Sequence, residues 1–235
     1  MNRSTHDLRN VAAENPKPVH AVIAIDGPAA SGKSSVSRLL ARRLDFAYVN
    51  SGGLYRAVAW NAHRGGISPE EPSAILEQIS GSHFEFGIRN KESFVLIGGF
   101  DPGPFLQGEQ VNRTVSLVST IPDVRTFIVD QLRRFADLDD LIMEGRDIGS
   151  VVFADTPYKF YIDASPEVRA QRRSAQGLQD EISKRDRLDT SRATAPLTIA
   201  SDATVIDSSL LTVEGVVCKI VDRLKDQKLR QATSL

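Results

Sequence analysis

The chain has 235 residues, of which 41% are hydrophobic and 25% are charged, and its formal net charge is -1. This composition predicts a globular protein with one sizeable packed core. A net charge so close to zero argues against a broad electrostatic grip on nucleic acid or on an anionic membrane, so we expect neither as a partner. Any anion that binds must therefore be contacted by a local group of Lys and Arg side chains.

The only cysteine, Cys218, excludes an intrachain disulfide and a cysteine metal site. It lies in LLTVEGVVCKIVDRL, an apolar segment with helical spacing, which predicts a buried, unreactive thiol. The amino terminus shows no apolar secretory segment, and no run of about 18 apolar residues occurs. We expect a cytoplasmic protein.

Residues 1–20 are polar and interrupted by prolines, which predicts a flexible leader. The run AVIAID predicts a buried strand, the glycine-rich GPAASGKSS a loop, and VSRLLARRL a helix. FAYV predicts a second strand, followed by a loop that leads into a helix ending at a glycine pair. Residues 21–66 thus begin an α/β core.

The pattern changes over residues 67–110. SPEEPSAILEQIS predicts a short helix opened by Ser68 and Pro69, and FEFGI and SFVLI predict an antiparallel hairpin around the polar turn RNKE. A glycine- and proline-rich loop, GGFDPGPFLQG, follows. We interpret residues 67–110 as an α+β module inserted into the core.

Residues 111–228 continue the core. Helices are expected on both sides of Pro122, and DLIMEG predicts a buried strand with a Glu at its end. YKFYID and ATVID predict two more strands. ASPEVRAQRRSAQG predicts a helix begun by Ser165 and Pro166, and LTVEGVVCKIVDRLKDQ a last helix capped by Thr212. Strands alternating with helices predict a parallel sheet covered on both faces, with residues 229–235 as a tail.

The segment GPAASGKS, Gly27 to Ser34, matches G-x-x-x-x-G-K-[ST] at every position and stands between a predicted strand and a predicted helix. In such a loop the backbone N–H groups converge on phosphate oxygens, Lys33 contacts the β- and γ-phosphates, and the Ser34 hydroxyl binds Mg²⁺. The expected ligands are therefore ATP and Mg²⁺. The loop residues expected to bind ATP are Gly27, Pro28, Ala29, Ala30, Ser31, Gly32, Lys33, Ser34 and Ser35.

A GTPase would need an NKxD motif, but the only similar segment, NKES, ends in Ser and lies in a predicted hairpin turn. Kinases that act on small molecules are built at this chain length. An acceptor that is itself a phosphate needs a cationic clamp and no strong general base. Arginines stand where loops should meet the carboxyl ends of strands, and a guanidinium grips phosphate bidentately. These arginines are Arg56, Arg146, Arg185 and Arg192.

Several segments in order along the chain resemble the bacterial-type cytidylate kinases, a branch of the nucleoside monophosphate kinases: IDGPAASGKSS, SGGLYR, IPDVR, EGRDIGSVVFADTPYKFYIDASPEVRAQRR, RDRLDTSRATAPL and DATVIDSS. The resemblance spans residues 22–224. It implies a P-loop kinase fold with a five-stranded parallel sheet, helices on both faces, residues 67–110 as the monophosphate-binding module and a short lid over residues 170–184. It also implies a monomer that transfers phosphate from ATP to CMP or dCMP, forming CDP or dCDP.

The resemblance further implies roles for individual residues. Contacts to CMP are implied for Ser51, Tyr55, Arg56, Ser116, Arg125, Arg146, Asp147, Arg185, Asp189 and Arg192. Within this set, Ser116, Arg125 and Asp147 would face the cytosine, and Arg185 and Asp189 the ribose. Contacts to phosphate are implied for Arg56, Arg146 and Arg192. The implied catalytic residues are Lys33, Arg146, Asp147 and Arg192. Arg169, which directly precedes the lid, and Arg173 within it would reach the ATP phosphates.

A carboxylate such as Asp147 can accept a hydrogen bond from the exocyclic amine of cytosine but not from the carbonyl of uracil, which predicts a preference for CMP over UMP. Two positions depart from the family pattern: Asn50 replaces the usual Asp, and the lid between Arg173 and Ile182 is short. Another small acceptor, such as shikimate or a different nucleoside monophosphate, is the alternative enzyme. A regulator that binds nucleotide without catalysis is the alternative outside enzymes.

Overall fold

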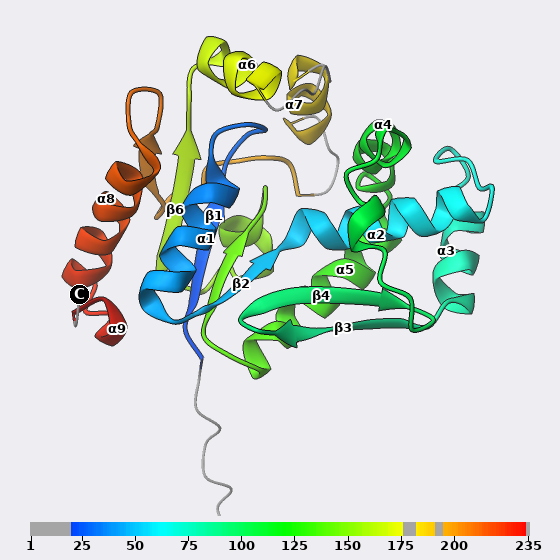
Figure 1. Cartoon of the computed structure of the whole chain (residues 1–235), viewed down its shortest axis with the longest axis horizontal. Helices are drawn as coiled ribbons and strands as arrows, with labels where there is room; N and C mark the ends of the chain where they lie inside the picture. The colour runs from blue at the N-terminus through cyan, green and yellow to red at the C-terminus, as the bar shows by residue number, and fades with distance from the viewer. Residues whose placement is uncertain (1–19, 176–181, 191–194, 234–235) are drawn as a thin grey trace, which may run out of the picture.

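The computed structural model describes residues 20–175, 182–190 and 195–233. Seven strands form one sheet in the order β3-β4-β2-β5-β1-β6-β7 (Figure 1). Neighbouring strands from β2 to β7 in this order run parallel. The strands are β1 (Val22–Asp26), β2 (Ala47–Asn50), β3 (Phe84–Arg89), β4 (Glu92–Ile97), β5 (Leu141–Glu144), β6 (Tyr158–Asp163) and β7 (Thr204–Asp207).

The expectation of a parallel α/β sheet is confirmed, but the expected number of five strands is wrong. The predicted hairpin forms as β3 and β4, and β4 then joins the sheet parallel to β2 through the pair Tyr48 and Glu92. An uncovered β2 would present unpaired N–H and C=O groups along a sheet edge. The hairpin covers that edge, so part of segment 67–110 extends the core sheet.

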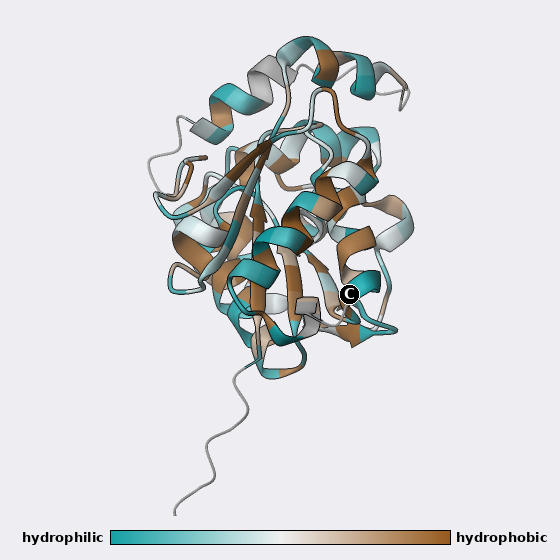
Figure 2. Ribbon diagram, turned by 90° about the vertical axis from the view of Figure 1, so that its left-hand side faces the viewer, coloured by the Kyte–Doolittle hydropathy of each residue, from teal (hydrophilic) through white to brown (hydrophobic). Residues whose placement is uncertain are grey.

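Helices cover both faces of the sheet because the side chains of the central strand alternate. Ile23 and Ile25 pack in one apolar cluster, and Val22 and Ala24 pack in the other. The first cluster includes residues of α1 (Lys33–Leu44), α8 (Val213–Asp226) and α9 (Arg230–Thr233). The second includes residues of α2 (Ser51–Arg64), α3 (Pro72–Gly81), α4 (Glu109–Val118) and α5 (Pro122–Arg134). Figure 2 shows the hydrophobic strands between these helical layers.

Three local expectations need correction. The helix of the inserted segment begins at Pro72 rather than at Ser68 or Pro69, with Pro72 at its first position. Cys218 is exposed, because it follows the buried pair Val216 and Val217 on the outer side of α8. The predicted tail starts with residues that pack in the core, since Leu229 and Ala232 are buried.

The carboxyl ends of the parallel strands lie at one edge of the sheet, where α6 (Pro166–Ala175) and α7 (Ile182–Thr190) also lie (Figure 1). Short helical turns connect the longer elements: η1 (Gly103–Phe105), η2 (Phe135–Asp137) and η3 (Ile148–Val152), the last a π-helical turn directly after β5. No helix within the described ranges is long and apolar enough to cross a membrane.

Candidate active site at the carboxyl edge of the sheet

The loop from Gly27 to Ser34 joins β1 to α1, as its motif predicts. Gly27 has φ 147°, and a Cβ at this position would lie 2.1 Å from the carbonyl oxygen of Ile162 in β6. Only glycine, which has no Cβ, allows the two backbone segments to approach so closely. Gly32, with φ 94°, precedes the first residue of α1, Lys33. The amino end of α1 therefore opens at the carboxyl edge of the sheet, where its N–H groups suit an anion.

Lys33 is almost fully buried in this loop, at 5% exposure. Its Nζ donates a hydrogen bond to the Pro28 carbonyl over 2.6 Å. Burial, reinforced by the Arg146 guanidinium, lowers the pKa of Lys33 to about 7, against the opposite pull of Glu144 and Asp26. The amine is thus a poorly solvated cation, and phosphate would be its natural counter-charge.

Two cavities meet at the phosphate loop. The first has a volume of about 580 Å³ and is lined by Ala29, Ala30, Lys33, Ser34, Asn50, Ser51, Gly52, Tyr55, Arg56, Gln107, Val115, Ser116, Ser119, Glu144, Gly145, Arg146, Asp147, Arg173 and Asp189. The second, about 470 Å³, is lined by Ala30, Ser31, Gly32, Lys33, Ser34, Ser35, Val36, Arg172, Arg173, Ala175, Ser208, Leu211, Thr212, Val213 and Val216. Ala30, Lys33, Ser34 and Arg173 line both, so two ligands would meet at these residues.

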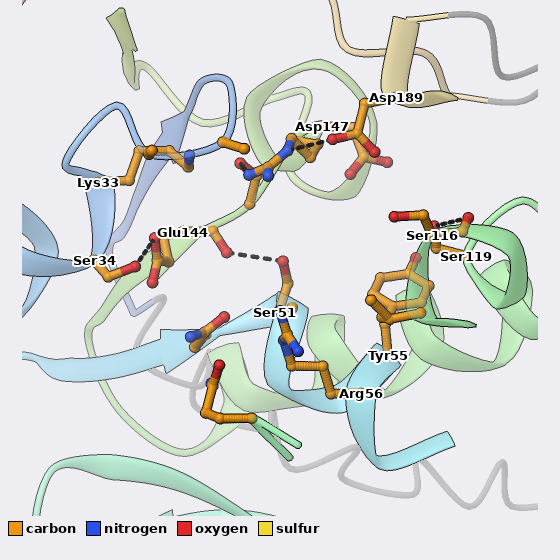
Figure 3. A pocket seen from close by; sticks show the side chains of 18 of the residues that line it. Lys33, Ser34, Ser51, Tyr55, Arg56, Ser116, Ser119, Glu144, Asp147 and Asp189 are labelled. Atoms are coloured by element: carbon orange, nitrogen blue, oxygen red, sulfur yellow. Dashed lines mark hydrogen bonds and ion pairs between the residues drawn. The ribbon is translucent and has the colours of Figure 1, made fainter. Parts of the chain in front are cut away.

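Residues at the start of α2 are fixed against neighbouring segments in the first cavity (Figure 3). The Ser51 hydroxyl donates to the Glu144 carbonyl of β5 over 2.8 Å. Arg56 donates through Nη1 to the Leu106 carbonyl at 3.0 Å and to Asn112 Oδ1 at 2.7 Å. These contacts hold the Arg56 guanidinium at the wall of the cavity instead of leaving it in solvent.

Asp147 reaches this cavity from the turn after β5, and its carboxylate forms a buried ion pair with Arg125 of α5. Arg125 also donates to the Ser119 carbonyl over 3.3 Å, and its guanidinium carbon lies 5.7 Å from the centre of the Tyr55 ring. Arg125 is not among the residues that line the cavity. Its ion pair with Asp147 and its position over the Tyr55 ring connect α5 to the wall of the cavity.

Arg146, the residue before Asp147, is paired with α7. Its Nε lies 2.7 Å from Asp189 Oδ2, and Asp189 is 4% exposed. Burial disfavours the charge of Arg146, but the Asp189 carboxylate outweighs it, so the pKa of Arg146 is raised. This pair joins α7 to the turn after β5 and keeps a permanent cation in the first cavity.

Glu144 ends β5 beside the phosphate loop. Its Oε2 accepts a hydrogen bond from Ser34 over 3.0 Å, and its Oε1 accepts one from the Tyr48 hydroxyl. Burial and the nearby Glu144 raise the pKa of Tyr48, so the phenol keeps the proton that it donates. Hydroxyl and carboxylate oxygens suit Mg²⁺, which takes few protein oxygens alongside substrate phosphates. Ser34 and Glu144 fit that donor set.

Arg172, which the sequence did not single out, holds the loop on the side of the second cavity. It donates through Nη1 to the Ser31 carbonyl at 3.2 Å and to Ser208 Oγ at 3.0 Å. Arg169 instead pairs with Asp186 and donates to the Ala29 carbonyl, and it lines neither cavity. The spacing of Arg169, Arg172 and Arg173 on one helical face was the signal available for Arg172.

The structure brings most of the predicted site residues together. The first cavity includes the predicted CMP residues Ser51, Tyr55, Arg56, Ser116, Arg146, Asp147 and Asp189. The second includes the predicted ATP residues Ala30, Ser31, Gly32, Lys33, Ser34, Ser35 and Arg173. Gly27 and Pro28 line neither, and Ala29 lines the first. Arg192 and the side chain of Arg185 lie outside the described part. Glu144 is not among the residues predicted for the site, although a carboxylate that closes an apolar strand is a signal of function.

The chain is similar to known proteins over most of its length. The sequence model described as cytidylate kinase matches residues 23–226. A cytidylate kinase of Rhodococcus jostii is 39% identical over 212 residues, which cover 85% of this chain and 93% of that protein. One from Geobacillus thermodenitrificans is 37% identical over 216 residues, covering 87% and 96%. A solved shikimate kinase from Acinetobacter baumannii aligns with 90% of this chain and 96% of its own, at a TM-score of 0.45 and 17% identity, too distant to identify a substrate.

Proposed function

This chain belongs to the cytidylate kinase family, and from that premise we propose that it transfers the terminal phosphoryl group of ATP to CMP, forming CDP and ADP. The observation that carries the proposal is the pair of cavities that share Lys33, Ser34 and Arg173. A kinase must hold donor and acceptor phosphates against each other. One cavity on each side of a phosphate loop provides that arrangement.

The second cavity takes the ATP and the first takes the acceptor. The second is built from loop backbone and from apolar residues of α8, which suit a triphosphate and a base. The first holds Tyr55, Ser116 and the Asp147 carboxylate, which suit a nucleobase with an amine donor. The acceptor therefore lies with its cytosine towards Asp147 and its phosphate towards Lys33.

In the reaction, an oxygen of the CMP phosphate forms a bond to the γ-phosphorus of ATP, and the bond from that phosphorus to the β–γ bridging oxygen breaks. The electron pair leaves with ADP. The acceptor oxygen is already ionised, so no residue need act as a strong base. Lys33, Arg146 and Arg173 surround the transferring group and stabilise the charge on its oxygens. Arg185 and Arg192 remain predicted contributors.

Mg²⁺ bound with ATP would be held by the oxygens of Ser34 and Glu144, and it would neutralise phosphate charge. The Tyr48 hydroxyl orients Glu144 for this role by its hydrogen bond. We also propose that dCMP is accepted and that the protein acts as a monomer in the cytoplasm, which light scattering of the purified protein and cell fractionation test.

The decisive experiment is a coupled assay of ADP formation with CMP, dCMP, UMP, AMP and shikimate, each with ATP and Mg²⁺. Turnover of CMP and dCMP well above that of UMP, AMP and shikimate supports the proposal. Turnover of UMP equal to that of CMP contradicts the role of Asp147, and ADP formation only with shikimate contradicts the acceptor class. Tight ATP binding without transfer to any acceptor would favour a regulator.

A further inference from the structure

The turn that carries Arg146 and Asp147 into the acceptor cavity has an unusual helix start. Asp147 is the N-cap residue of η3, the position where an aspartate side chain normally accepts hydrogen bonds from the first N–H groups of its own helix. Here the Asp147 carboxylate makes no such bond. It is instead paired with Arg125 and lines the cavity. The first N–H groups of η3 therefore need another acceptor.

Asp26 of β1 is that acceptor. Its Oδ1 accepts from the N–H of Ile148 over 2.8 Å, and its Oδ2 accepts from the N–H of Gly149 over 2.7 Å. Ile148 and Gly149 are the first two residues of η3, more than 120 positions away in the sequence. The two oxygens of one carboxylate thus replace the missing side-chain cap.

Asp26 is also the last residue before the phosphate loop. It is 6% exposed, and burial raises its pKa to about 6, while the hydrogen bonds from Gly149 and Ile148 act in the opposite direction. Both oxygens accept from N–H groups, which favours the ionised form of the carboxylate. Asp147 and Lys33 are the charged groups that act on it.

A buried aspartate is costly unless its oxygens are satisfied by hydrogen bonds or charge. The simplest use of Asp26 is structural, to close the end of β1. That use does not explain why the carboxylate bonds to the residues that directly follow Arg146 and Asp147. An aspartate at the end of the neighbouring strand offers a contrast, because Asp163 Oδ1 accepts from the N–H of Ala164, the next residue in the sequence.

We propose that Asp26 is a positioning residue for acceptor recognition: by capping η3 in place of Asp147, it keeps the Asp147 carboxylate at the wall of the acceptor cavity and fixes the positions of Arg146 and Asp147 relative to Lys33. The inference rests on the proposed function for the identity of the acceptor. It adds a residue that touches neither nucleotide and acts through the turn after β5.

The test is Asp26→Asn. An amide keeps one acceptor oxygen, but its NH₂ group faces the second N–H, so one of the two caps is lost. Loss of one buried hydrogen bond predicts a KM for CMP raised about tenfold and a kcat/KM ratio of CMP over UMP lowered by about the same factor, with a smaller change in the KM for ATP.

Asp163→Asn is the matched control, since it makes the same change at the end of the next strand, and it should leave the ratio of CMP over UMP unchanged. A merely structural role of Asp26 would lower the thermal midpoint and the active fraction but not this ratio. If Asp26→Asn acted through Lys33 instead, the KM for ATP would rise, and the kcat/KM ratio of CMP over UMP would not change. An unchanged ratio in Asp26→Asn therefore overturns the proposal.

Hydrogen exchange in the wild-type protein gives a second test that does not depend on the folding of the variant. The amides of Ile148 and Gly149 should be protected without nucleotide and exchange more slowly with CMP bound, because the base then fixes Asp147. Free exchange of these amides, or no slowing with CMP, overturns the proposal. If the wild type does not phosphorylate CMP at all, the proposed function fails, whereas protected amides would still show the cap.

Discussion

The two sides of the phosphate loop are built in different ways. On the donor side, one continuous segment from Ala30 to Val36 supplies much of the wall, and Arg172 and Ser208 support it. On the acceptor side, the wall comes from separate segments and is made of side chains that hold one another: Ser51 with β5, Asp147 with Arg125, and Arg146 with Asp189.

This difference follows from what each side must recognise. Phosphates are alike in every nucleoside triphosphate, and N–H groups in a fixed loop suffice for them. A pyrimidine base and a ribose differ from their analogues by single polar groups, and only individually placed side chains can discriminate such groups. Changes to the donor side should therefore affect transfer to all acceptors, and changes to the acceptor side should affect the choice among them.

The largest effect is expected from Lys33→Ala. Removing the cation shared by both cavities should lower kcat by about a thousandfold or more with every acceptor, because it stabilises charge on the transferred group. CMP should still bind, as calorimetry can show. Lys219→Ala, an exposed lysine of α8, is the control. A fall in kcat with CMP but not with dCMP would contradict the expectation that changes to the donor side affect all acceptors.

Asp147→Asn should change acceptor choice. The amide presents a donor as well as an acceptor to the base, so kcat/KM for CMP over UMP should fall by about one to two orders of magnitude. Arg125 would lose its buried partner, so the thermal midpoint should fall as well. Steady-state kinetics with both acceptors measures the ratio. Asp155→Asn, an exposed aspartate in the loop after η3, should change neither.

Asp189→Ala should distinguish CMP from dCMP. If the carboxylate meets the 2′-hydroxyl, kcat/KM for CMP should fall about tenfold more than that for dCMP, the effect of one lost hydrogen bond. Asp186→Ala is the control in the same helix, because Asp186 pairs with Arg169 and does not line the acceptor cavity. It should affect both acceptors alike. If Asp189→Ala lowers kcat/KM equally for CMP and dCMP, that result contradicts the contact between Asp189 and the ribose.

The smallest expected effect is the uptake of part of a proton by Lys33 when ATP binds on the donor side. With a pKa of about 7, Lys33 is mostly neutral at pH 8 in the nucleotide-free protein, and bound phosphates favour its charged form. ATP binding should then take up part of a proton, and affinity should fall as pH rises from about 7 to 9. Calorimetry in buffers of different ionisation enthalpy measures this. Lys33→Arg, always charged, should show no uptake from this position.

Much of the donor side follows from local sequence. The strand, the loop and the helix around GPAASGKS are contiguous, and the glycine positions with positive φ are part of the motif. The acceptor residues Ser51, Tyr55, Arg56, Asp147 and Asp189 were expected from resemblance to a family, and their convergence required the fold. Arg172 was not predicted because it supports the backbone at Ser31, and a sequence motif for substrate contacts does not indicate such a supporting residue.

The sequence by itself determined the class of fold, the phosphate loop and the hairpin, because turn residues and the spacing of apolar side chains are local properties. It did not determine that the hairpin would add its strands to the core sheet, since pairing of Tyr48 with Glu92 depends on which sheet edge is left uncovered. Nor did it determine that Asp26 would cap η3 in place of Asp147. Only the packing of β1 beside β5 brings that carboxylate to those N–H groups.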